Sequence, residues 1–102
     1  MLISAEVDVI RLLADPLREQ IVELLAEQPA CTCHLVEDTG AKQPTVSHHL
    51  KVLREAGLVE AEPYGRYTYY RVVPEVLDRT ASRIAALADR ARATSGDRRE
   101  CA

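Results

Sequence analysis

Two cysteines one residue apart, Cys31 and Cys33, have the clearest capacity for chemistry in this chain. Thiolates bind soft and borderline ions, and thiols can also be oxidised. The pair lies at the start of a predicted short helix, and a helix N-terminus favours the thiolate over the thiol. Because residues i and i+2 do not face each other on a helix, both can hold one ion only if that first turn is not helical. The pair therefore predicts a site for a soft ion or for thiol oxidation.

A second group of polar side chains lies on one side of the segment 43–56. At about 100° per residue, Val46, Leu50 and Leu53 share one face of a helix, which we expect to be buried. The opposite face, its edge and the helix start carry the candidate DNA-binding residues Gln43, Thr45, Ser47, His48, Lys51 and Arg54. Such groups suit base edges and phosphates, although a solvated helix face has the same composition. His49 lies toward the buried side, which favours a packing role.

Four helices are predicted to position these residues. Apolar side chains recur at helical spacing over residues 3–14, 16–28, 32–39 and 43–56. Asp15 is the predicted N-cap of the second helix, and Pro16 its first residue. Thr32 is the predicted N-cap of the third helix, and Gly40 its C-terminal break. The fourth helix, which carries the polar face, begins with Pro44 in its first turn and ends at Gly57.

A β-hairpin and a long helix are predicted to follow. Strand-like segments over 58–62 and 67–73 flank the turn Pro63-Tyr64-Gly65-Arg66, whose Arg66 could reach a phosphate or the minor groove. Thr68, Tyr70 and Val72 alternate on one strand face and are predicted core residues. The last helix begins at Pro74. Its apolar positions, spaced alternately by four and three as in a seam for another helix, are Leu77, Ala81, Ile84, Ala88 and Ala91.

This order, α-α-α-α-β-β-α, is that of a mainly helical winged helix-turn-helix fold with a small β-hairpin. We expect one domain over residues 1–93 and a flexible C-terminal tail over 94–102. A chain of 102 residues buries a modest core, so a partner subunit would help its stability. No apolar run is long enough to span a bilayer, and the N-terminus does not resemble a secretory signal. We therefore predict a cytoplasmic protein without membrane partners, whose three cysteines stay reduced.

Charge is distributed unevenly along the chain, whose net charge is −3. Residues 1–41 carry two basic and eight acidic side chains, whereas residues 42–71 carry five basic and three acidic ones. The middle of the chain is therefore the candidate phosphate-facing surface.

The segment from Gln43 to Val59, QPTVSHHLKVLREAGLV, closely resembles the recognition-helix signature of the ArsR/SmtB family of metal-sensing repressors. Residues 13–18 resemble the same family, as do Gly65-Arg66 and Tyr70-Arg71-Val72, so the likeness covers about residues 7–77. The resemblance implies a homodimeric repressor whose first and last helices form the dimer interface. It also implies two recognition helices about one DNA turn apart on a two-fold symmetric operator.

The position of Cys31-Thr32-Cys33 is similar to that of the Cys-x-Cys in the arsenic-responsive branch of this family. This implies operator release when arsenite or antimonite binds the thiolates, although that branch often has a third cysteine where this chain has Val36. Both ions prefer three sulfurs, and Cys101 is the remaining thiol. Its tail could extend about 25 Å, including to the other protomer. Two thiolates with solvent or a small thiol are an alternative, and His34 could bind zinc or cadmium. The last helix has no histidine for the zinc site of other members.

Other functions remain open at this stage. The same repressor could sense cadmium, zinc, lead or thiol oxidation through the same cysteines. A small thiol enzyme is a different class, but the chain has no Cys-x-x-Cys in a βαβ context and no Ser/His/Asp constellation, so we predict no enzyme activity. A pure protein-interaction domain would show no sequence-specific DNA retention.

Overall fold

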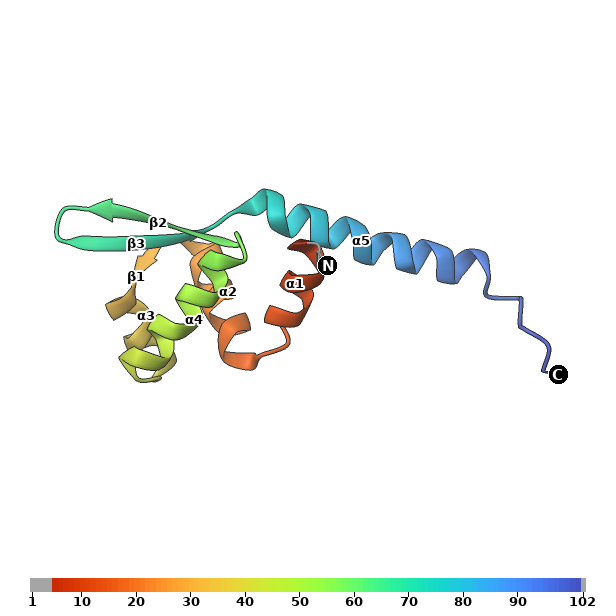
Figure 1. Ribbon diagram of the computed structural model, residues 1–102, viewed down its shortest axis with the longest axis horizontal. Helices are drawn as coiled ribbons and strands as arrows, with labels where there is room; N and C mark the ends of the chain where they lie inside the picture. Colours follow the sequence, from red (N-terminus) through yellow and green to blue (C-terminus); the bar gives the residue numbers. More distant parts are fainter. Residues whose placement is uncertain (1–4, 102) are drawn as a thin grey trace.

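A helical body carries a projecting hairpin on one side and a long C-terminal helix on the other (Figure 1). The structure is a computed structural model that describes residues 5–101. In chain order its elements are α1 (Ala5–Leu12), α2 (Pro16–Glu27), β1 (Ala30–Cys31), α3 (Thr32–Thr39), α4 (Gln43–Glu55), β2 (Val59–Tyr64), β3 (Tyr67–Val72) and α5 (Pro74–Ala93). This confirms the predicted winged helix-turn-helix with its hairpin wing. Ile3, in the predicted first helix, lies outside the described residues.

Side-chain and glycine caps define the ends of the middle helices. The Asp15 carboxylate accepts hydrogen bonds from the backbone N–H groups of Leu17 and Arg18, at 2.9 and 3.1 Å, and so begins α2 as predicted. Gly40 ends α3 with a φ of 73°, a left-handed conformation that favours glycine. The prediction of Thr32 as N-cap of α3 was wrong. Cys31, which is extended at φ −91° and ψ 169°, occupies the N-cap because it belongs to β1.

The sheet has three antiparallel strands in the order β1-β3-β2. The two-residue strand β1 was not predicted, because two residues carry no readable periodicity. The hairpin is also longer than predicted: β2 continues through Pro63 to Tyr64, and Gly65-Arg66 alone form the turn. A proline is tolerated there because β2 is an edge strand.

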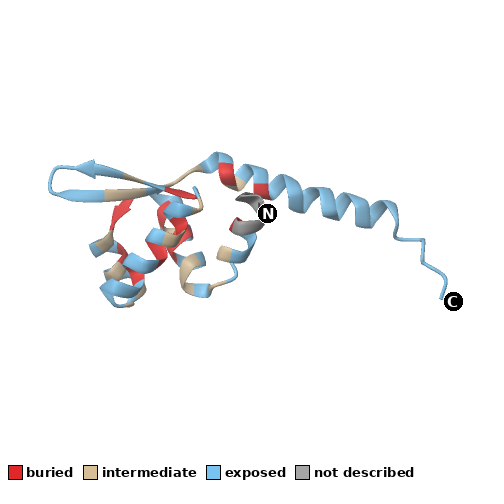
Figure 2. Cartoon of the chain, viewed as in Figure 1, coloured by how far each residue is buried: buried red, intermediate tan, exposed pale blue. Residues whose placement is uncertain are grey.

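The core lies between α2, α3, α4 and the base of the hairpin. Its largest fully buried side chains are Ile21, Leu35, Leu50, Leu53, Leu58, Val9 and Val46. The buried face predicted for α4 is therefore confirmed. Tyr70 and Val72 pack against this core as predicted, but Thr68 is exposed because the wing extends beyond the body at that point (Figure 2).

Helix α5 is half attached and half projecting. Its first turns contact α1 and bury Val76 and Thr80, whereas every residue from Ala81 to Cys101 is exposed (Figure 2). The large apolar side chains Ile84 and Leu87 are 51% and 52% exposed, and Ile10 of α1 is 41% exposed. Within the described residues, no helix has the length and apolar character needed to cross a membrane.

Candidate DNA interface and sensor site

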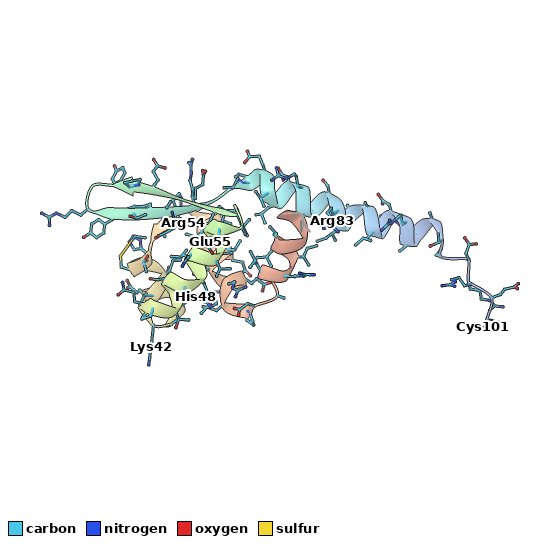
Figure 3. The ribbon with its side chains drawn as sticks, in the orientation of Figure 1. Lys42, His48, Arg54, Glu55, Arg83 and Cys101 are labelled. Carbon is cyan, nitrogen blue, oxygen red and sulfur yellow. A yellow bond between two sulfur atoms is a disulfide. The ribbon has the colours of Figure 1, made fainter. Side chains whose placement is uncertain are left out.

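The outward face of α4 presents its predicted polar residues to solvent. Gln43, Thr45, Ser47, His48, Lys51 and Arg54 are all exposed. Figure 3 labels His48 and Arg54 along this helix and Lys42 just before it, and the Lys42 side chain points away from the body. Hydroxyl, amide, imidazole and cationic groups are thus exposed along one helix, where they can meet base edges and phosphates.

A hollow of about 500 Å³ lies between α4 and the start of β2. It is lined by Lys51, Arg54, Glu55, Val59, Glu60 and Ala61. Its lining carries two cations, Lys51 and Arg54, and two carboxylates, Glu55 and Glu60, whereas Arg66 lies in the turn at the tip of the wing. Cations therefore lie at two separate places, on α4 and at the wing tip. This arrangement suits a protein that contacts DNA at two points.

A polar contact that the sequence did not reveal joins α2 to α4. Arg18 Nε donates a hydrogen bond of 3.0 Å to Nδ1 of His49, whose side chain is 8% exposed. Nδ1 of His49 therefore carries no proton, and the imidazole is neutral. Burial lowers the pKa of His49, partly opposed by the nearby Asp15 carboxylate, and the Arg18 and His48 charges lower it further. The pKa of Asp15 is also lowered, chiefly by the Arg18 backbone N–H.

Acid should destabilise the fold through His49. Since its folded pKa lies below the ordinary 6.5, the unfolded chain binds the proton first as the pH falls. The contribution of His49 to the free energy of unfolding is then fully present above about pH 6.5. Below that pH the free energy of unfolding declines by at most about 1.4 kcal/mol per pH unit. Urea unfolding between about pH 7.5 and 5.5 measures this slope. His49→Gln, whose amide oxygen can accept the Arg18 bond, should flatten it, and exposed His48→Gln should not. An unchanged slope in His49→Gln would contradict the assignment.

Three potential ligand residues gather where β1 meets α3. The ligand atoms of Cys31, Cys33 and His34 all lie within 4.8 Å of one another. We call these three residues the sensor cluster. Cys31 is buried, and the other two are exposed. The two sulfurs are joined in a disulfide, contrary to the expectation that all the cysteines are reduced.

The extended backbone of Cys31 explains why the two sulfurs meet. Cys31 precedes the helix and Cys33 lies in its first turn, so the helical i, i+2 separation does not apply. This is the non-helical start that joint binding of one ion requires.

His34, which the sequence offered only as a ligand for zinc or cadmium, is the third member of the cluster. Its Nδ1 accepts a 3.2 Å hydrogen bond from the Cys31 backbone N–H and lies 3.2 Å from Cys31 Sγ. The available signal was its position, three residues after the N-cap, where a capping-box side chain reaches back to the cap. A hollow of about 440 Å³ opens beside this imidazole.

Cys101 does not join the cluster within one chain. It is exposed at the end of the tail beyond α5, at the opposite end of the molecule from α3 (Figure 3). Any contact with Cys31 and Cys33 would have to come from the tail of another copy.

Comparison with known proteins supports one family. Residues 15–61 match the family described as bacterial regulatory protein, arsR family. An uncharacterised HTH-type transcriptional regulator of Methanocaldococcus jannaschii is 36% identical over 69 residues, which are 67% of this chain and 78% of that protein. The arsenical resistance operon repressor of Staphylococcus xylosus is 37% identical over 69% of this chain and 67% of its own. The transcriptional repressor SmtB of Mycobacterium tuberculosis is 41% identical over 70% of this chain, which spans only 53% of SmtB.

Solved structures agree with this. An ArsR-like transcriptional regulator from Rhodococcus sp. RHA1 has a TM-score of 0.75 and 29% identity, with 88% of each chain covered. A homodimeric winged helix-turn-helix DNA-binding domain from Mycobacterium bovis has a TM-score of 0.68 and 32% identity, covering 83% of this chain and 79% of its own. The winged fold, the α4 signature and these relatives together show that the chain belongs to the ArsR/SmtB family of DNA-binding transcriptional regulators, which are not enzymes.

Proposed function

We propose that this protein is a homodimeric repressor that releases its operator when arsenite or antimonite binds the thiolates of Cys31 and Cys33. The observation that carries the proposal is the sensor cluster, with two sulfurs and an imidazole within 4.8 Å at the start of α3. Binding requires the reduced pair, because a disulfide has no thiolate to offer.

The donor set fits a soft, thiophilic ligand. Two thiols would displace two hydroxyls of arsenous acid as water and leave one hydroxyl on arsenic. His34, or Cys101 of a partner copy, is the candidate third group. Thiolate and imidazole together also suit zinc and cadmium. Relatives named for arsenical resistance and relatives named SmtB match this chain to similar extents. A titration must therefore distinguish arsenite and antimonite from zinc and cadmium as inducer.

The homodimer is supported by unpartnered apolar side chains. Ile10, Ile84 and Leu87 are between 41% and 52% exposed on α1 and α5, the two helices that pack together. The Mycobacterium bovis relative is described as homodimeric. A two-fold dimer would present two copies of α4 to a symmetric operator.

Operator release by an ion is a linkage effect. The ion must bind the free dimer more tightly than the DNA-bound dimer, and the ratio of the two affinities sets the degree of release. Equal ion affinity with and without operator would refute the proposal.

A release titration tests the function directly. The DNA is a duplex recovered from a random-sequence library by retention on the reduced protein, and fluorescence anisotropy follows its complex, with sedimentation reporting the protein stoichiometry. Arsenite and antimonite should release the duplex at lower concentrations than cadmium or zinc. Release by cadmium or zinc alone would reject the arsenic assignment, and failure to retain any duplex would reject the repressor.

The disulfide itself favours one second candidate, a thiol-oxidation sensor. Two thiols and one hydrogen peroxide would give the Cys31–Cys33 disulfide and two waters. Under strict reduction, arsenite should release the DNA. Release by peroxide, reversed by dithiothreitol and without response to arsenite, would establish the oxidation sensor instead.

A further inference from the structure

We propose that the sensor cluster controls DNA binding through the wing, and that Tyr69 of β3 is the residue that couples them. The inference rests on the proposed function and adds the route by which a bound ion acts. Three contacts between residues that are adjacent in space connect the cluster to the turn at the wing tip.

The first contact is made by the backbone. Cys31 is at once the N-cap of α3 and a residue of β1, where it pairs in register with Tyr69. Strand β1 is only two residues long, so few hydrogen bonds maintain this pairing. A change in the backbone at Cys31 therefore acts directly on β3, which is one strand of the wing.

The second contact is made by His34. Its Nδ1 accepts the Cys31 N–H at 3.2 Å, and its ring centroid lies 6.1 Å from that of Tyr69, with the ring planes tilted by 58°. The single Nδ1 lone pair cannot serve both the backbone N–H and an ion. An ion that engages the imidazole must therefore take Nδ1 from Cys31 or turn the ring to offer Nε2. Either change alters the contact between His34 and Tyr69.

The third contact runs along the wing. The Tyr69 ring meets the Tyr64 ring edge-on, with centroids 5.8 Å apart and planes at 71°. Tyr64 is the last residue of β2 and directly precedes the Gly65-Arg66 turn. The row His34–Tyr69–Tyr64 thus carries a displacement of the cluster toward Arg66, which is the predicted wing contact with DNA.

Tyr69→Leu is the test, because it removes the ring and keeps an apolar side chain. We expect it to bind arsenite, as followed by thiolate–arsenic absorption in the ultraviolet, and to retain the operator without arsenite. The ratio of operator Kd values with and without arsenite, about 5- to 150-fold for typical coupling, should fall at least about fivefold. Tyr69→Phe keeps the ring and should restore the ratio.

Tyr67→Leu is the matched control. Tyr67 lies two residues away on the same face of β3, is 59% exposed, and has no ring contact with His34 among those the structure shows for the described residues. It should keep the wild-type ratio. A wild-type ratio in Tyr69→Leu would overturn the coupling route. Absence of release from the wild-type protein would instead refute the proposed function, so the two failures are distinct.

A second variant keeps the test valid if Tyr69→Leu does not fold. Arg66→Ala leaves the sensor cluster and Tyr69 in place and removes the cation at the wing tip. If arsenite acts by withdrawing the wing, this variant should bind the operator more weakly without arsenite and should also show a smaller Kd ratio. Weaker binding with an unchanged ratio would show that the signal leaves the cluster by another path.

Discussion

Replacing Cys31 with serine is expected to weaken operator release by arsenite, raising the arsenite concentration required by about 100-fold. The physical reason is ligand softness, because a serine hydroxyl does not replace a thiolate toward a thiophilic ion. Cys33→Ser should behave alike, since both sulfurs belong to the same cluster. Without arsenite, operator affinity should remain within about twofold, because neither residue lies on the outward face of α4. The measurement is the anisotropy titration of each reduced variant on the same duplex.

Cys101→Ser is the matched control for this prediction. It makes the same chemical change at an exposed thiol at the opposite end of the molecule (Figure 3). A wild-type response would show that the tail is not a required ligand. A loss of response would instead identify Cys101 of a partner copy as the third sulfur. A normal response in Cys33→Ser would refute the sensor assignment.

Lys51→Ala and Arg54→Ala should each weaken operator binding by about 1–3 kcal/mol, or roughly 5- to 150-fold. Both side chains are exposed and line the hollow between α4 and the start of β2. A cation on a phosphate also releases counterions, so each variant should reduce the slope of log K against log salt by about 1. If the cation instead contacts a base edge, its removal should relax the sequence preference of DNA binding.

Arg98→Ala provides the comparison for charge alone. It removes one positive charge from the exposed tail after α5, a segment that lies at the opposite end of the molecule from α4 (Figure 1). It should leave both affinity and salt slope close to wild type. If Arg98→Ala and Lys51→Ala lowered affinity equally, the net charge of the protein and not its α4 face would govern binding.

Much of the helical framework was predictable because its causes are local. The apolar spacing of Val46, Leu50 and Leu53 alone defines the inner face of α4, and these residues are indeed 0%, 1% and 0% exposed. Asp15 and Gly40 act through their own backbone neighbours, so their capping roles were also visible in the sequence. The long hairpin was predicted in kind but not in length, because nothing local prevents Pro63 from continuing an edge strand.

The site likewise has features that were predictable from the sequence and features that were not. The sequence by itself determined the thiol pair, the polar face of α4 and their order along the chain. Only the tertiary structure decided that Cys31 lies in a strand beside Tyr69, that His34 turns back onto it, and that Arg18 reaches His49. The pairing of Cys31 with Tyr69 joins residues 38 positions apart, and that of Arg18 with His49 joins residues 31 apart. Their proximity follows from how the core packs α2, α3, α4 and β3 together, which no local pattern of residues records.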